Sequence, residues 1–140
     1  MQIHIIYWSG TGNTKAMAEL IQNGAQSAGA EVTVTEVSAV DISTALDADV
    51  IALGCPAMGP EVLEESVFEP FIAAIEDSIN GKKLALFGSY GWGDGEWMRD
   101  WTARMENAGA ILVAESLIVN EAPQGDSADQ CTEFGMAIAQ

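Results

Sequence analysis

The chain has 140 residues, 49% of them apolar, and its 21 acidic and 5 basic side chains give a formal charge of −16. This length allows one domain, residues 1–140, with its own hydrophobic core, and no apolar run is long enough to cross a bilayer. Such a negative field excludes nucleic acid and anionic membranes as partners and favours proteins with basic surfaces. At the N-terminus no basic region precedes the first apolar stretch, so we expect no signal peptide and a location in the cytoplasm. We also expect the protein to be a monomer.

Short apolar or alternating segments are separated by segments whose apolar residues recur at helical spacing. The segment 31–37 alternates like an edge strand, whereas 50–54 is apolar throughout, as in a central strand covered on both faces. Strands that alternate with helices predict an α/β fold, with a parallel sheet and helices on both of its faces. Strands are expected at 3–6, 31–37, 50–54, 84–88 and 111–119, and helices at 14–28, 41–48, 67–79, 96–108 and 127–139.

The loop between the first strand and the first helix has the composition of an anion site. Four N–H groups at a helix start lack an intrahelical partner, and the helix dipole adds partial positive charge there. Here the helix start follows Ser9-Gly10-Thr11-Gly12-Asn13-Thr14, whose hydroxyl and amide groups add donors without charge. A P-loop requires Gly-Lys-Ser/Thr and the dinucleotide fingerprint requires Gly-x-Gly-x-x-Gly, and the loop matches neither. The residues therefore predict a phosphate monoester held by neutral donors, and they leave the ligand unnamed.

Side chains for independent catalysis are scarce. His4, the one histidine, lies inside a predicted strand and is interpreted as structural. Cys55 and Cys131 lack metal or redox spacing and are interpreted as reduced structural thiols. No cluster of residues has metal-ligand spacing. A chain without catalytic side chains but with a phosphate loop indicates that a bound cofactor does the chemistry.

A second glycine-rich loop, 89–95, carries aromatic side chains. Trp92 stands between Gly91 and Gly93, where an indole is poorly placed for the core and well placed to lie on a planar ring. Trp97 and Trp101 are one helical turn apart, and we expect both to pack in the interior.

Three loops carry a common pattern of small, polar and aromatic residues: Ser9-Gly10-Thr11-Gly12-Asn13-Thr14, Cys55-Pro56-Ala57-Met58-Gly59 and Gly88-Ser89-Tyr90-Gly91-Trp92-Gly93. Together they resemble the loops of the flavodoxins, at family-like spacing over essentially the whole chain. The resemblance implies a flavodoxin-like, doubly wound, five-stranded parallel sheet of order 2-1-3-4-5, with the cofactor at the carboxyl ends of strands 1 and 3. A fifth strand without an insertion resembles the short-chain members.

The resemblance also implies that FMN, bound non-covalently, is the cofactor. Trp92 would lie on the outer face of the isoalloxazine ring and Met58 on its inner face. The Gly59 carbonyl would turn toward flavin N5–H on reduction, and Glu61 would accept a hydrogen bond from N3–H. The peptide that turns is Gly59–Pro60, and proline restricts it. The expected cofactor-binding residues are Trp8, Ser9, Gly10, Thr11, Gly12, Asn13, Thr14, Pro56, Ala57, Met58, Gly59, Glu61, Ser89, Tyr90, Gly91, Trp92 and Gly93.

Acidic residues near the loops, with only Lys15 as a basic one, favour a flavin that gives up its electron at low potential. The resemblance implies a one-electron carrier without substrate turnover, which serves redox enzymes with basic docking surfaces in place of ferredoxin. The alternative is a flavodoxin-fold NAD(P)H-dependent quinone reductase, which would bleach its flavin with NAD(P)H alone. A phospho-acceptor receiver has the same strand order but places clustered acids after strand 1, where this chain has Ser-Gly-Thr-Gly.

Overall fold

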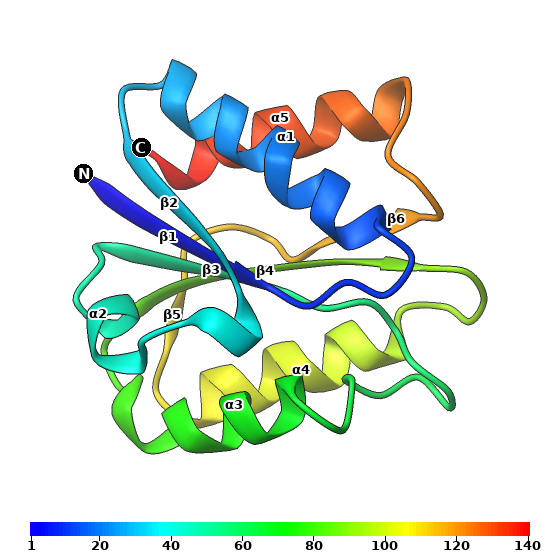
Figure 1. Ribbon diagram of the computed structural model, residues 1–140, viewed down its shortest axis with the longest axis horizontal. Coiled ribbons are helices and arrows are strands. Elements are labelled where there is room, and N and C mark those ends of the chain that lie inside the picture. Colours follow the sequence, from blue (N-terminus) through cyan, green and yellow to red (C-terminus); the bar gives the residue numbers. More distant parts are fainter.

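The computed structural model describes residues 1–140 and contains one parallel sheet. The order β2-β1-β3-β4-β5, with β6 also beside β4, confirms the predicted doubly wound arrangement (Figure 1). The strands are β1 Gln2–Tyr7, β2 Glu31–Glu36, β3 Val50–Gly54, β4 Lys83–Tyr90, β5 Ile111–Leu112 and β6 Leu117–Asn120. The helices are α1 Asn13–Ser27, α2 Ile42–Leu46, α3 Phe68–Ile75, α4 Glu96–Asn107 and α5 Asp126–Ile138, with 3₁₀ turns η1 Val37–Ala39 and η2 Glu76–Ser78.

The prediction of one continuous strand over 111–119 is wrong, because the chain leaves the sheet between β5 and β6. Leu112 of β5 pairs with Leu84 of β4, and Leu117 of β6 pairs with Phe87. The chain thus advances from residue 112 to 117 while its partner positions on β4 advance only from 84 to 87. The extra residues form a bulge, which bends the strand and leaves residues unpaired. Within it the Ser116 hydroxyl lies 2.8 Å from the Thr102 hydroxyl of α4. Hydrophobic periodicity does not reveal a change of register of this kind.

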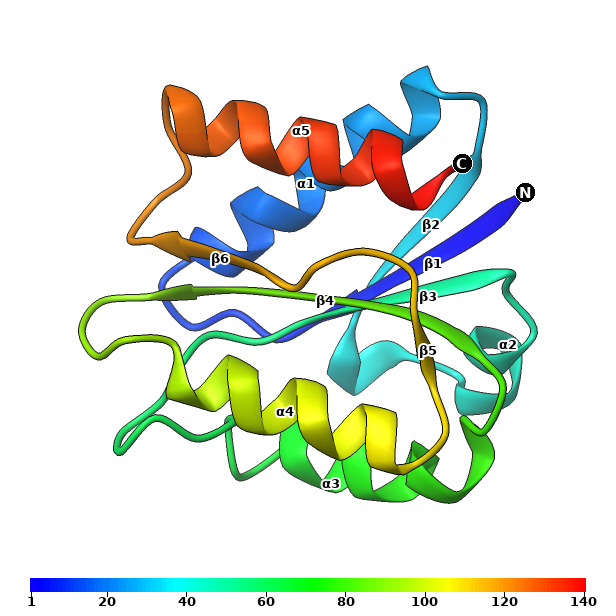
Figure 2. The ribbon, with the colours of Figure 1, turned by 180° about the vertical axis from the view of Figure 1, so that it is seen from behind.

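Helices cover both faces of the sheet, as predicted. The helices α1 and α5 lie together on one face, and α3 and α4 lie on the other (Figures 1 and 2). Two hydrophobic cores result, one on each face. No helix is both long and apolar enough to span a bilayer.

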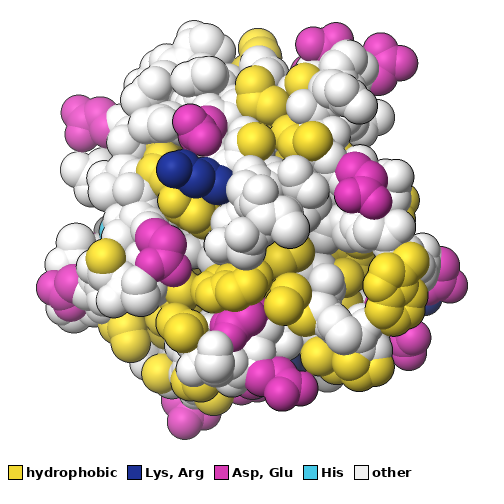
Figure 3. All heavy atoms as spheres, turned by 45° about the vertical axis from the view of Figure 1, so that its right-hand side comes forward, with side chains coloured by type: hydrophobic (Ala, Val, Ile, Leu, Met, Phe, Trp, Pro, Cys, Tyr) yellow, Lys and Arg dark blue, Asp and Glu magenta, His cyan; other side chains and the backbone are white.

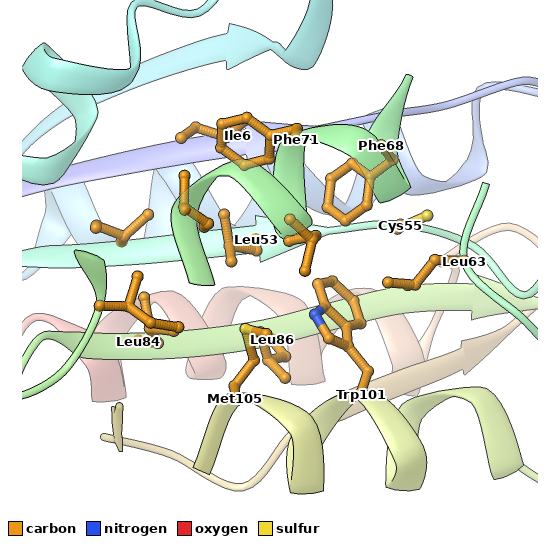
Figure 4. Close-up of a cluster of buried hydrophobic side chains, with 14 of the residues drawn as sticks. Ile6, Leu53, Cys55, Leu63, Phe68, Phe71, Leu84, Leu86, Trp101 and Met105 are labelled. Atoms are coloured by element: carbon orange, nitrogen blue, oxygen red, sulfur yellow. The ribbon is translucent and has the colours of Figure 1, made fainter. Parts of the chain in front are cut away.

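The core under α3 and α4 contains the largest buried side chains. Trp97 and Trp101 are 1% and 2% exposed, which confirms that both pack in the interior. The ring of Trp101 meets Phe68 of α3 edge to face, with centroids 5.5 Å apart, a favourable aromatic geometry. Figure 4 shows Trp101 reaching from α4 toward Phe68, with Leu86 of β4 beside it. This packing fixes α3 and α4 against the sheet.

The helices α1 and α5 approach each other through glycine. A methyl group on Gly24 would lie 1.9 Å from the carbonyl oxygen of Thr132, and one on Gly135 would lie 2.1 Å from the carbonyl oxygen of Ile21. Both distances are far shorter than any real contact, so the two backbones touch where only hydrogen atoms fit. The helix that starts at the first glycine-rich loop is therefore held by the last helix of the chain.

Candidate functional site

Three loops meet at the edge of the sheet where β1, β3 and β4 end. Because parallel strands end at one edge, residues far apart in sequence surround a single hollow of about 260 Å³. Figure 3 turns this side of the molecule forward and shows hydrophobic side chains in a band across it, with acidic side chains around the band. The hollow is lined by Trp8, Gly10, Thr11, Asn13, Pro56, Ala57, Met58, Ser89, Tyr90, Gly91, Trp92 and Glu121.

The first loop presents free donors, as an anion site requires. The helix α1 begins at Asn13 without a side-chain cap, and the N–H groups of Thr11, Asn13 and Thr14 donate to no acceptor in the chain. Gly12 has φ 98°, a left-handed conformation that favours glycine, and this turn directs the chain into the helix. The Ser9 hydroxyl oxygen accepts from the N–H groups of Gly12 and Lys15 at 3.1 and 3.3 Å. Its own proton remains available to a ligand.

The Thr14 hydroxyl joins the first loop to the third. This side chain is 1% exposed, and its Oγ1 lies 3.0 Å from Oγ of Ser89 at the end of β4. The side chain of Thr14 thus lies behind the hollow, although the sequence suggested it as one of the donors around the phosphate. Its hydroxyl fixes the start of α1 against the sheet.

The second loop closes as a small hairpin. Met58 and Val62 exchange two backbone hydrogen bonds of 2.9 and 3.0 Å and form an antiparallel bridge. Gly59 and Glu61 both have positive φ, 48° and 56°, and flank Pro60. Left-handed backbone is rare for glutamate and stores strain at this tip. The tip of this hairpin is the three-residue segment Gly59-Pro60-Glu61 between the bridged residues.

The carboxylate of Glu61 reaches across to the third loop. Its Oε1 accepts from the N–H of Asp94 at 3.1 Å and its Oε2 from the N–H of Trp97 at 3.2 Å. A methyl group on Gly93 would lie 1.9 Å from Glu61 Oε1, so Gly93 makes room for the carboxylate. Two loops and the start of α4 are joined at this side chain.

The third loop holds one aromatic ring outside and one inside. Trp92 is 65% exposed at the hollow, and no other aromatic ring pairs with it. Tyr90 instead packs on Trp97, with ring centroids 5.8 Å apart. The indole N–H of Trp97 donates to the Cys55 carbonyl at 3.1 Å, which ties α4 to the second loop. Trp92 is the most exposed of these rings, and Tyr90 also lines the hollow.

Several predicted residues surround the hollow without lining it. Gly12, Gly59 and Gly93 supply turns by their positive φ, and Glu61 and the hydroxyl groups of Ser9 and Thr14 hold the loops together. The rest of the predicted residues line the hollow itself.

Two charged residues at the site were missed by the sequence reasoning. Glu121 lines the hollow just after β6, has φ 58°, and donates its N–H to the Tyr90 carbonyl at 2.8 Å. Its position after a strand at the same edge of the sheet could have suggested it. Arg99 of α4 pairs with Asp94 at 3.0 Å on the third loop, and both side chains are exposed. Arg99 is therefore a cation beside the site that already has a partner.

The two cysteine thiols, Cys55 and Cys131, are buried and do not line the hollow. Burial raises the pKa of the Cys55 thiol to about 12 and that of Cys131 to about 11, so both stay protonated. This agrees with the structural role predicted for them. The largest hollow on the surface, about 1040 Å³, lies between η2 and α4 over Asn80 and Arg104, away from all three loops.

A doubly wound sheet with a neutral phosphate loop and a glycine-aromatic loop at its switch point defines a mononucleotide-binding α/β protein. The family model for flavodoxin matches residues 5–135. The chain is 57% identical to the flavodoxin of Clostridium beijerinckii over 136 residues, which covers 96% of this chain and 97% of the relative. It is 49% identical to the flavodoxin of Megasphaera elsdenii over 138 residues, 99% of this chain and 98% of the relative.

The solution structure of the two-electron-reduced M. elsdenii flavodoxin matches with a TM-score of 0.90 at 47% identity, covering 98% of each chain. The chain belongs to the flavodoxin family. It is accordingly an FMN-binding electron carrier rather than an enzyme with its own substrate turnover, and the quinone-reductase alternative gains no support.

Proposed function

We propose that FMN binds with its phosphate at loop 9–14 and its ring at Met58 and Trp92, and that the protein carries single electrons at low potential. The observation that carries this proposal is the meeting of free helix-start N–H groups and an exposed indole at one hollow. Bound FMN supplies the redox chemistry. The residues of the chain bind it, orient it and adjust its potential.

At the phosphate end, neutral donors replace cations. The free N–H groups of Thr11 and Asn13 point from the helix start, where the dipole favours negative charge. The hydroxyl of Thr11 is exposed at the hollow, and that of Ser9 keeps its proton to donate. A phosphate monoester matches this donor set because it has only acceptor oxygens to offer.

At the ring end, Trp92 offers an exposed face for stacking and Met58 offers apolar cover from the second loop. Each oxygen of the Glu61 carboxylate accepts one bond from the third loop or α4 and has a second lone pair free. Glu61 therefore keeps these bonds while it accepts another from ring N3–H. In this role it both holds the loops and reads the polar edge of the ring.

The charges around the hollow set the potential low. Glu61 and Glu121 lie at the site, and Arg99 is neutralised by Asp94. Negative charge added to the ring on reduction thus meets carboxylates, while Lys15, the one basic residue of the loops without an ion-pair partner, belongs to the start of α1 at the phosphate loop, so the charge is stabilised little.

Titration of the flavin-free protein tests the binding assignment. We expect one FMN per chain and a riboflavin Kd at least tenfold higher, because riboflavin lacks the phosphate. Stepwise reductive titration should show two separable one-electron steps. Equal affinity for the two flavins would refute the phosphate assignment, and reduction by NAD(P)H alone would favour the quinone reductase.

The negative electrostatic field of the protein also favours docking of basic redox proteins. We infer that acids at the rim, including Glu61, Asp94 and Glu121, steer a basic partner toward the hollow, and that self-repulsion keeps the chain monomeric. With a basic c-type cytochrome as acceptor, the bimolecular rate should fall as ionic strength rises toward ~0.15 M, where the screening length is about 8 Å. Replacing Asp94 by Asn should weaken the salt dependence more than the same change at the remote Asp47. A salt-independent rate, or a dimer in sedimentation equilibrium, contradicts this part of the proposal.

A further inference from the structure

A buried carboxylate lies at the base of the second loop. Glu64 is only 5% exposed, yet it carries no partner cation. Its Oε1 accepts from the Ser66 N–H at 2.7 Å and from the Ser66 hydroxyl, and its Oε2 accepts from the N–H groups of Val67 and Phe68 at 3.0 and 3.1 Å. These N–H groups belong to the start of α3, so the carboxylate satisfies donors that a helix start leaves open.

Hydrogen bonds of this kind compensate the burial of the charge. Burial alone would raise the pKa of the Glu64 carboxyl, but the bonds from Ser66, Phe68 and Val67 together hold that pKa below its ordinary value. The backbone of the residue is tied as well, because its N–H donates to Cys55 Sγ at 3.4 Å and its carbonyl accepts from the Glu69 N–H at 2.8 Å. Glu64 thus joins the end of β3 to the start of α3.

The position of Glu64 matters because it stands two residues after the Met58–Val62 hairpin. At the tip of that hairpin, Glu61 accepts a hydrogen bond from the start of α4. Just after the hairpin, Glu64 accepts hydrogen bonds from the start of α3. The two helices are themselves connected, because Arg104 of α4 binds Glu69 at 2.7 Å and Glu76 at 2.7 Å. The strained hairpin tip is therefore held in a closed frame, in which Glu64 is a buried carboxylate link.

We propose that Glu64 is a positioning residue for the flavin, which fixes the base of the Met58–Val62 hairpin and thereby sets ring affinity and the first reduction potential. The inference rests on the proposed binding of FMN. It assigns no contact between Glu64 and the cofactor.

Glu64→Gln tests the proposal, since glutamine keeps the shape but turns an acceptor into a donor that faces other donors. Glu65→Gln is the matched control, because this neighbouring acid is exposed, makes no hydrogen bond or ion pair through its side chain, and loses the same charge. For the folded holoproteins we expect Glu64→Gln to raise the Kd of FMN and of riboflavin at least tenfold and by the same factor, because the hairpin serves the ring end. Glu65→Gln should change both values less than twofold.

The reduction potential separates positioning from general destabilisation. In a variant that is only less stable, the affinities for oxidised and reduced flavin fall by the same factor. Its first reduction potential depends on the ratio of these affinities and therefore equals that of Glu65→Gln. We expect the first potentials of Glu64→Gln and Glu65→Gln to differ by at least about 30 mV, a threefold change in relative affinity at about 59 mV per factor of ten for one electron. If Glu64→Gln does not fold, Ser66→Ala removes one donor of the same cluster, and a smaller change in both quantities is expected.

Equal first potentials in Glu64→Gln, or in Ser66→Ala, and in the control would overturn the inference whether or not the affinities differ. If instead the parent protein binds no FMN, the proposed function fails, so the two failures are distinguishable.

Discussion

The carboxylate of Glu61 accepts a hydrogen bond from the N–H of Trp97 at 3.2 Å and so joins the second loop to the first turn of α4. Replacing Glu61 by Ala leaves N–H groups of the third loop and α4 without acceptors. Loss of a helix cap costs about 0.5–2 kcal/mol, and we expect a reduction of this size in the free energy of unfolding of the flavin-free protein. Urea unfolding measures it, with Glu65→Ala as the control. A loss no larger than that of the control would show that the bond contributes nothing.

Thr11→Val should lower the affinity for FMN by about tenfold, because it removes one hydrogen bond to a charged group, worth roughly 1.4 kcal/mol. The affinity for riboflavin should stay within twofold. The reason is that the Thr11 hydroxyl is exposed at the helix start, where only the phosphate would meet it. Fluorescence titration with both flavins provides the measurement. Loss of affinity for both flavins by one factor would place the Thr11 side chain at the ring.

Trp92→Ala removes an exposed ring without disturbing the core, since the side chain is 65% exposed. Stacking on a nucleobase-like ring is worth about 1–3 kcal/mol, so FMN affinity should fall by one order of magnitude or more. Flavin fluorescence in the holoprotein should rise, because the indole no longer quenches it. Undiminished quenching with flavin still bound would show that Trp92 does not lie on the ring.

Pro60→Gly should raise the first reduction potential. Proline has a fixed φ and biases Gly59, which has φ 48°, against rearrangement, so it favours the arrangement present in the oxidised protein. A relief on the order of 1 kcal/mol corresponds to a several-fold shift between the two loop arrangements. Redox titration of parent and variant measures the effect, with Pro123→Gly as a control outside the hollow. An unchanged or lowered first potential would be incompatible with a restraint by Pro60.

His4 should lower the free energy of unfolding as the pH falls. It is 6% exposed, with Nε2 2.8 Å from Thr35 Oγ1, and burial lowers its pKa below 6.5. The folded state therefore binds the proton less readily than the unfolded state does. Its contribution to stability is fully present above pH 6.5 and is lost as pH falls through the folded pKa.

The comparison with His4→Gln isolates this effect from the titration of the many carboxylates. Relative to the variant, the parent should lose unfolding free energy between about pH 7.5 and pH 5 in urea unfolding. Parallel curves for the two proteins over this range would show that His4 does not titrate differently on folding.

The sequence allowed the position of the site to be predicted because the carboxyl ends of parallel strands share one edge. Loops 9–14, 55–61 and 89–95 were expected at that edge, and the structure brings them to one hollow. The role of Glu64 was not predictable, since only the fold shows that its side chain turns back onto α3. Glu121 could have been suggested by its position just after the last strand, whereas the bulge that shifts the register before β6 has no signature in hydrophobicity. The sequence therefore indicates which loops meet, and the contacts that hold them require coordinates.

The glycine contacts between α1 and α5 have a consequence for synthesis. The phosphate loop begins a helix whose packing partner, α5, is made much later, and Thr132 lies 108 positions after Gly24 in the sequence. At about 5–20 residues per second, a ribosome needs roughly 5 to 20 s after the synthesis of Gly24 to reach Thr132. During that time the helix start has donors but no support, so we expect FMN to be captured only after α5 has emerged. The order of synthesis thus delays cofactor capture until the chain can hold it.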